Sequence, residues 1–313
     1  MQKSTTTTSN GAQNMTEGNI RKLIIRFAIP VMLSNLFQQL YNSVDSLIVG
    51  NFLGKEALAA VSSSGPLIFL LVSFFNGTAM GAGVVISRYY GAGENEKVLK
   101  AVHTNVAFGL VSGTLLTIVG MAATPVILRW MGTAPEVLPN SISYFRYYFL
   151  GALAIVMYNI FTGIMNAVGD SRRPMQYLIF SSILNVVLDL LFVGVFKMGV
   201  GSAAVATTIS QAVSALLCLR RLMTKGLVCQ VIPSRIRFHK DMLKEIVRFG
   251  LPTGIQNSVI AIANVIVQSN INSFGTEAMA AYGSYSKIEG FAFLPITCFA
   301  MAMTTFIGQN LGA

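Results

Sequence analysis

Long apolar runs dominate the pattern of hydrophobic and polar positions along the chain. A helix that crosses the hydrocarbon core of a bilayer needs about 20 mostly apolar residues. Runs of this kind span residues 24–52, 57–87, 101–128, 144–168, 174–196, 200–219, 246–272 and 278–307. The segments between them are short, so consecutive helices are expected to run antiparallel. The pattern predicts an all-α integral membrane protein with eight transmembrane helices.

Composition and charge refine this prediction. The 313 residues are 53% hydrophobic and only 11% charged. When the predicted helices alternate in direction, most of the 22 Lys and Arg residues fall at the N-terminus and in the loops after the second, fourth and sixth helices. This positive-inside bias predicts a multi-pass protein of the plasma or inner membrane with a cytoplasmic N-terminus. The net charge of +10 therefore reflects topology, and no basic nucleic-acid-binding module accompanies it.

The sequence contains an internal repeat. The segment RFAIP (26–30) returns as RFGLP (248–252), and GKEALAA (54–60) returns as GTEAMAA (275–281). Six predicted helices separate the copies, so both copies enter the membrane from the same side. Parallel halves of this kind are typical of transporters, with the substrate path between them.

The repeat also predicts how the chain is organised. We expect a disordered cytoplasmic tail over 1–19, a six-helix lobe over 20–219, a basic cytoplasmic linker over 220–247, and the first two helices of a second lobe over 248–313. By the same offset, a complete second lobe would need about four more helices. We therefore expect the chain to be C-terminally incomplete.

Two acidic residues stand inside apolar runs. A charge near the bilayer centre costs about 2.5 to 3.5 kcal/mol, so Asp45 and Asp189 are functional candidates. Asn185 precedes Asp189 by one turn, and Thr207 lies at a similar depth if each residue adds about 1.5 Å. These side chains are expected to share one water-filled pocket, open to the outside, in the first lobe. Two close acids there are expected to hold a proton or a cation, and Na⁺ at the pair is the one metal site predicted.

Other polar side chains are expected to line the cavity. The first helix carries a polar stripe that runs toward Asp45, and the seventh keeps a stripe without an acid, so ion coupling is expected in the first lobe. Glu289 in the last helix is expected to line the central path. The predicted lining residues are Gln38, Tyr41, Asn42, Asn257, Asn264, Gln268 and Glu289.

The remaining candidate chemistry is limited. Cys218, Cys229 and Cys298 have no paired spacing, so neither a disulfide nor a zinc site is expected. His103, near the cytoplasmic start of a helix, is expected to be solvated. No cofactor is predicted apart from the coupling ion.

Three stretches carry a family resemblance. The run from Ile25 to Gly93 with RFAIP, VDSLIVGNFLG and EALAAVS, the segment NAVGDSRRPM (166–175), and LNVVLDLLF (184–192) resemble the multidrug and toxic compound extrusion (MATE) exporters. The resemblance implies two six-helix lobes that export amphipathic, often cationic compounds in exchange for protons or sodium ions.

The resemblance also assigns residues. It implies that Asp45 matches the aspartate of the first helix, and that Asn185, Asp189 and Thr207 match the cation and proton site of the first lobe. Pro30 matches a proline near which the first helix bends, which makes it a candidate hinge. Ile260 stands where one branch of the family carries an acid.

The predicted function is therefore a cation-coupled antiporter that exports small organic cations by alternating access, within the lipid bilayer and without an obligate protein partner. One alternative is a flippase for lipid-linked saccharides, but few Arg residues lie at mid-membrane depth to line a basic cavity. The other is a membrane-embedded enzyme. Because the chain offers no HExxH, GxSxG or Cys/His pair, no catalytic residue is predicted.

Overall fold

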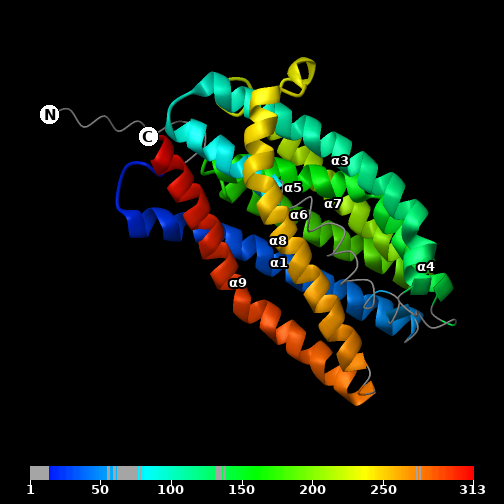
Figure 1. Ribbon diagram of the computed structural model, residues 1–313. Helices are drawn as coiled ribbons and strands as arrows, with labels where there is room; N and C mark the ends of the chain where they lie inside the picture. The colour runs from blue at the N-terminus through cyan, green and yellow to red at the C-terminus, as the bar shows by residue number, and fades with distance from the viewer. Residues whose placement is uncertain are drawn as a thin grey trace.

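Every regular element that the structure describes is a helix, which confirms the all-α prediction (Figure 1). The computed structural model describes residues 14–54, 57–58, 61, 77, 79–130, 136, 138–272, 274 and 276–313, without the side chains of Trp130 and of several residues between 265 and 288. The greater part of the predicted disordered tail, residues 1–13, lies outside the described residues.

The helices follow the apolar runs closely. They are α1 (Ile20–Leu53), α3 (Asn95–Trp130), α4 (Leu138–Leu150), α5 (Ala152–Ala167), α6 (Arg172–Asp189), α7 (Gly201–Leu222), α8 (Lys240–Asn272) and α9 (Thr276–Gly312). Residues 79–91 form a further helix, and the portion of the second apolar run that precedes it lies mostly outside the described residues.

Within the described residues, 5 helices are long and apolar enough to cross a membrane, or 6 if α4 and α5 count as one bent span. This supports a multi-pass membrane protein, while the number of eight crossings stays a prediction. The run predicted as one helix over 144–168 is divided, because α4 and α5 meet at an angle of 47°. A Cβ at Gly151, between them, would meet the Thr208 side chain, so glycine lets α7 approach the bend closely.

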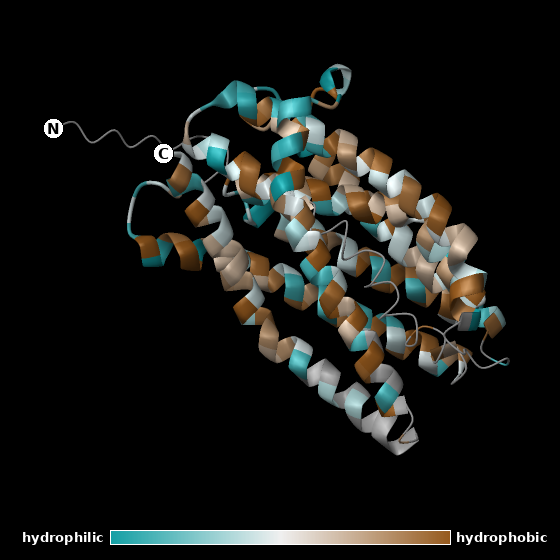
Figure 2. Cartoon of the chain, in the orientation of Figure 1, coloured by the Kyte–Doolittle hydropathy of each residue, from teal (hydrophilic) through white to brown (hydrophobic). Residues whose placement is uncertain are grey.

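The helices that precede the linker form a bundle. Helix α1 packs against α6, α3 packs against α4 and α5, and α7 packs against α4, α5 and α6. Their inward faces and residues 79–91 share one large apolar core, which includes Ile86, Phe145 and Ile164. Large apolar side chains such as Leu47, Ile118 and Leu216 point outward and are more than 60% exposed. Figure 2 shows apolar residues along the outer faces of the helices, as a surface in contact with lipid requires.

Helices α8 and α9 contact this bundle mainly near one end. The C-terminal end of α8 and the N-terminal end of α9 lie away from the other helices (Figure 1). Near the contacting end, α9 packs against α1 around Phe27, Val31, Leu294 and Cys298. The Tyr89 hydroxyl donates a 2.7 Å hydrogen bond to Glu245 Oε1 of α8. The N-terminal portion of α1, the loop before α3, and the linker before α8 all lie at this end, which is the end predicted to be cytoplasmic.

Glycines bring the helix backbones together at this end. A Cβ at Gly81 would collide with the backbone of Gly250, and one at Gly77 with Gly254, both in α8. A Cβ at Gly91 would collide with the Gln309 backbone of α9. Because glycine has no side chain, the helix that ends at residue 91 can pack closely against both α8 and α9.

Residues 14–19, which the sequence placed in the disordered tail, pack against α9. Met15 is completely buried, and its backbone N–H donates to Gln309 Oε1 at 2.9 Å. Gln309 Nε2 in turn donates to the carbonyl of Ala167 at 2.9 Å, and Asn310 Nδ2 donates to the carbonyl of Met15 at 3.1 Å. These paired contacts, together with the apolar cluster around Phe27, explain why the tail prediction is wrong for this short segment.

The close approach of helices can be tested with two neighbouring glycines. Gly81→Val should destabilise the protein by about 1–3 kcal/mol relative to Gly83→Val, because overpacking forces the helices apart. Gly83 is the matched control, since a Cβ there meets nothing within 4 Å and valine has the same helix propensity at both positions. Thermal unfolding in detergent can be followed with a thiol-reactive dye, because all three cysteines are buried. Equal midpoints for the two variants would contradict this packing.

Candidate functional site

The two intramembrane acids meet inside the bundle. Asp45 of α1 and Asp189 of α6 lie within hydrogen-bonding reach of each other. Asp45 is 6% exposed and Asp189 is 0% exposed. Neither oxygen of Asp189 has a hydrogen-bond donor among the described residues, nor does Asp45 Oδ1. A buried carboxylate without a donor is unfavourable, and a proton or a cation between the two groups would relieve this cost.

The backbone changes its form at Asp189. Helix α6 ends there and continues as a π-helical segment, η1 (Leu190–Val195). Segments of this kind insert an extra residue into a turn and occur often at functional sites. The segment also packs against α1, where Phe52 lies beside Gly194. The second acid is therefore held at a junction between two helix types, close to the outer end of α1.

Asn185 lies one helical turn before Asp189 on α6, and it contacts Thr207 of α7. Asn185 is 1% exposed, and its Nδ2 donates to Thr207 Oγ1 of α7 at 3.4 Å. Asn185 Oδ1 has no donor among the described residues. The site therefore contains amide and carboxylate oxygens that lack donors and lie on two neighbouring helices. Such oxygens suit a hard cation such as Na⁺ as well as a shared proton.

The site includes polar groups that sequence analysis missed. Gln211 Nε2 donates to the Tyr41 hydroxyl at 3.1 Å, and Tyr41 also contacts Gln38. Tyr144 of α4 lies close enough to both acids to interact with them electrostatically. Gln211 follows Thr207 by one helical turn, so spacing was a usable signal for it. Tyr144 gave no such signal, because only the packing of α4 brings it to the acids.

The polar stripe of α1 divides between two faces. Gln38, Tyr41 and Asp45 face the interior of the bundle, with Gln38 only half-buried. Asn42 is exposed, on the side of α1 where Asn35 Nδ2 contacts Cys298 Sγ of α9 at 3.2 Å. Gln39, on the same side, lies near Gly290 of α9. Asn42 therefore belongs to the surface between α1 and α9 rather than to the acid site.

The other predicted lining residues lie on α8 and α9, away from the acid pair. Asn257 is half-buried and Asn264 is exposed on α8. Glu289 of α9 is half-buried and accepts a hydrogen bond from Tyr285 on the same helix. The Gln268 side chain lies outside the described residues. The structure thus separates the predicted site into a buried acid centre and a scattered polar set on the other two helices.

Pro30 lies inside α1, where it cannot donate to the carbonyl one turn earlier. The Ser34 hydroxyl donates to the Pro30 carbonyl at 3.0 Å. Pro30 is buried beside the contact between α1 and α9. This local loss of a backbone hydrogen bond makes it a structurally sound position for a hinge.

The predicted open, water-filled pocket differs from what is observed. The acids do meet, but Asp189 has no accessible surface at all. Helices α1, α6 and α7 close around the pair. His103 is also not solvated, since it is only 2% exposed and accepts a hydrogen bond from the linker. Buried polar partners take the place of water at His103, whereas close helix packing encloses the acids.

Comparison with known proteins identifies the family to which this chain belongs. A family model described as MatE matches residues 30–191 and 252–313, more than half of the chain. This chain belongs to the MATE family. MATE proteins are membrane transporters and not enzymes, so the recognition from sequence and the exclusion of an enzyme are both confirmed.

Named MATE relatives are similar over most of this chain. The probable multidrug resistance protein YoeA of Bacillus subtilis is 31% identical over 308 residues, covering 96% of this chain and 66% of the relative. The multidrug export protein MepA of Staphylococcus aureus is 24% identical over 289 residues, covering 92% of this chain and 64% of the relative. This chain therefore spans about two thirds of the length of the curated MATE relatives it matches.

Solved MATE structures share the fold. A structure described as the outward-facing conformation of a multidrug resistance MATE family transporter matches with a TM-score of 0.87 and 30% identity, covering 96% of this chain and 67% of that one. A transporter of the same superfamily from Pyrococcus furiosus, described as having a binding pocket of reversed polarity, matches with a TM-score of 0.88. The helical bundle and the placement of α8 and α9 are thus those of a MATE transporter.

The contact between the acids predicts a pH-dependent stability. Asp189→Asn should raise the thermal midpoint at about pH 9, where both wild-type carboxyl groups tend to ionise and repel each other. The new amide would donate a hydrogen bond to Asp45 instead. We expect the free energy of unfolding to rise by about 1–3 kcal/mol. The gain should shrink at about pH 5, where a shared proton joins the wild-type pair.

The exposed substitution Glu17→Gln is the control for a simple change in charge. Scanning calorimetry in detergent at both pH values gives the comparison. A loss of stability at the higher pH would show that the two carboxyl groups do not repel each other there.

Proposed function

We propose that this protein is a cation-coupled antiporter that exports small organic compounds, often cationic, in exchange for protons or sodium ions. The observation that carries this proposal is the enclosed pair of Asp45 and Asp189, which face each other with no hydrogen-bond donor to Asp189 among the described residues. A site of this kind cannot hold two negative charges without a counter-ion or a proton. It therefore changes its charge when it loads or releases an ion.

The proposed roles follow from position. Asp45 and Asp189 bind the proton or sodium ion, while Asn185 and Thr207 supply neutral oxygens around it. The hydrogen bond from Gln211 to Tyr41 holds α7 against α1, and Gln38 contacts Tyr41 within α1. Loading the pair removes repulsion between α1 and α6, whereas unloading restores it. Because α1 also contacts α9, a change in α1 packing reaches the interface between the two halves.

The proposed topology has eight crossings. Residues 20–219 form a six-helix lobe, residues 220–247 form a cytoplasmic linker, and residues 248–313 begin a second lobe related to the first by a parallel repeat. The cytoplasmic N-terminus, within a plasma or inner membrane, is supported by the basic residues of the tail, loops and linker. The bending of α4 against α5 is compatible with one broken span.

Alternating access is supported by where the halves touch. Near the cytoplasmic end, the contacts are Tyr89 with Glu245, Gln309 with Ala167, and Gly81 with Gly250. Toward the other end, α8 and α9 leave the bundle and expose side chains such as Val259 and Ile266. We assign this arrangement to an outward-facing state. Pro30 lies beside the contact, where a bend of α1 would loosen it.

Substrates would pass between the halves, along Asn42 of α1, Asn257, Asn264 and Gln268 of α8, and Glu289 of α9. The acid on α9 suits a cationic compound, and the exposed apolar residues of α8 suit its hydrophobic portion. Drug export by the curated relatives supports the same substrate class. The family names do not favour a saccharide flippase or an enzyme.

The role of the acid pair can be tested by transport. In proteoliposomes, Asp45→Asn should lower efflux of a fluorescent organic cation by about tenfold or more, because a neutral amide cannot exchange a proton or a cation. Efflux is measured first with an imposed pH gradient and then with a sodium gradient. The gradient that drives wild-type transport identifies the coupling ion.

Asp241→Asn serves as the control, since Asp241 is exposed at the start of α8 and far from the pair. Its efflux should stay at the wild-type rate. Full activity of Asp45→Asn under either gradient would remove Asp45 from the mechanism.

A further inference from the structure

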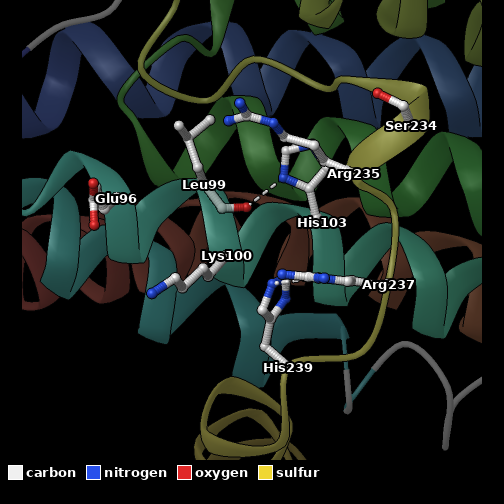
Figure 3. Close-up of a pocket in the computed structure, with 8 residues that line it drawn as sticks. All are labelled: Glu96, Leu99, Lys100, His103, Ser234, Arg235, Arg237 and His239. Atoms are coloured by element: carbon white, nitrogen blue, oxygen red, sulfur yellow. Dashed lines mark hydrogen bonds between the residues drawn. The ribbon is translucent and has the colours of Figure 1, made fainter.

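A cavity lies at the end predicted to be cytoplasmic, away from the acid site. It has a volume of about 330 Å³ and lies between the first turns of α3 and the end of the linker before α8. Figure 3 shows Arg235 and Arg237 extending from the linker toward the side chains of α3. The lining residues are Glu96, Leu99, Lys100, His103, Ser234, Arg235, Arg237 and His239. The proposed transport mechanism uses none of them.

The charges around this cavity are mostly positive. Lys100, Arg235 and Arg237 are basic side chains of the lining, and Glu96 is its single acid. None of the three cations forms an ion pair with a carboxylate among the described residues, where the ion pairs are Lys97 with Glu94 and Arg173 with Asp170. The cavity therefore gathers several uncompensated cations.

His103 fixes the linker to α3. Its Nε2 accepts the backbone N–H of Ile232 at 3.0 Å, so Nε2 carries no proton. Its Nδ1 must then be the protonated nitrogen, which donates to the carbonyl of Leu99 at 2.6 Å. Both ring nitrogens are occupied, which makes His103 a buried structural anchor rather than a ligand.

His239 anchors the linker in a similar way, closer to the start of α8. Its Nε2 accepts from Arg237 Nε at 3.2 Å, and its Nδ1 lies 3.2 Å from Thr104 Oγ1 of α3. The backbone N–H of His239 donates to the same hydroxyl. Burial, followed by the positive charges of Arg237 and Lys100, lowers the pKa of His239. The position is thus electropositive, and the ring stays neutral there.

These contacts leave the cationic groups free for a ligand. Arg237 uses only Nε in its bond to His239 within the described residues, so its two terminal nitrogens remain available. Lys100, Arg235 and Arg237 are exposed, which lets them reach an incoming anion. Two guanidinium groups provide forked donors that match the tetrahedral oxygens of phosphate, and an ammonium group adds a point charge.

We propose that this cavity binds a phosphate group, carried either by a soluble cytoplasmic phosphate or by the headgroup of an anionic lipid. Arg235 and Arg237 bind the phosphate oxygens as forked donors, Lys100 neutralises the remaining charge, and the Ser234 hydroxyl donates from the linker. An extended nucleic acid does not fit this proposal, because the cations surround one compact cavity.

The bound phosphate has a structural consequence. Residue 239 directly precedes α8, so an anion that bridges Lys100 and Arg237 ties the start of α8 to α3. This effect is independent of which ion drives transport.

The test compares two double variants of the full 313-residue chain, purified in a neutral detergent. Arg235→Gln with Arg237→Gln removes the proposed donors, whereas Arg220→Gln with Lys225→Gln removes the same charge from exposed positions outside the cavity. Isothermal titration with inorganic phosphate gives the affinity. The cavity variant should bind about tenfold more weakly or worse, and the control should stay within about twofold of wild type.

A second arm uses nanodiscs to separate the two sources of phosphate. Phosphatidylglycerol is compared with phosphatidylcholine, and bound lipid is counted by native mass spectrometry. Saturable binding of inorganic phosphate that the cavity variant loses supports a soluble ligand. Retention of phosphatidylglycerol that the cavity variant loses, without binding of inorganic phosphate, supports a lipid headgroup. Binding of neither probe, or equal loss in both double variants, overturns the proposal.

Histidine resonances locate the ligand directly. The chain has only 2 histidines, so selective ¹⁵N labelling gives two ring signals. The probe that binds should shift the His239 signal in wild type and in the control, and should leave it unchanged in the cavity variant. An unshifted His239 signal under saturating probe would place the anion elsewhere and overturn the proposal. Matching thermal midpoints for the two double variants establish that both are folded.

Discussion

The arrangement of the first lobe depends on enclosing two carboxyl groups in one apolar bundle. Asp45 and Asp189 come from helices far apart in sequence, and α1, α6 and α7 close around them. Apolar packing stabilises the bundle. The cost of burying two carboxylates at its centre is offset only when a proton or a cation is bound there. The same packing that shields the acids also links their charge to the position of α1. The proposed ion binding would therefore be coupled directly to the packing of α1.

The close contact between the helix that ends at residue 91 and helices α8 and α9 depends on glycine, which has no side chain. Glycines at positions 77, 81 and 91 let the second helix of the first lobe lie directly against α8 and α9. Few specific bonds then join the halves within the described residues, chiefly those of Tyr89, Gln309 and Met15. Close backbone contact with few polar links forms a tight seal that a modest change in energy can open. A transporter that alternates between two states needs a seal of this kind.

The linker before α8 is held against α3 by hydrogen bonds and also leads into α8. His103 and Thr104 hold residues 232 and 239 through hydrogen bonds, which fixes where α8 begins. Some of the basic residues from which the orientation in the membrane is predicted thus also line a cationic cavity. Composition alone could not separate a role in topology from the proposed role in ligand binding.

The sequence by itself determined the class of protein, most helix positions, the repeat and the two acids. The length of an apolar run, and the cost of a charge inside it, depend on the surrounding lipid and not on which helices are neighbours. Asn185 and Thr207 also followed from spacing along single helices. Only the tertiary structure decided that the acid site is closed, that Tyr144 joins it, that Asn42 is exposed rather than part of it, and that His103 is buried. Contacts between helices depend on how they rotate and pack, and a period of 3.6 residues in one helix carries no information about its partner.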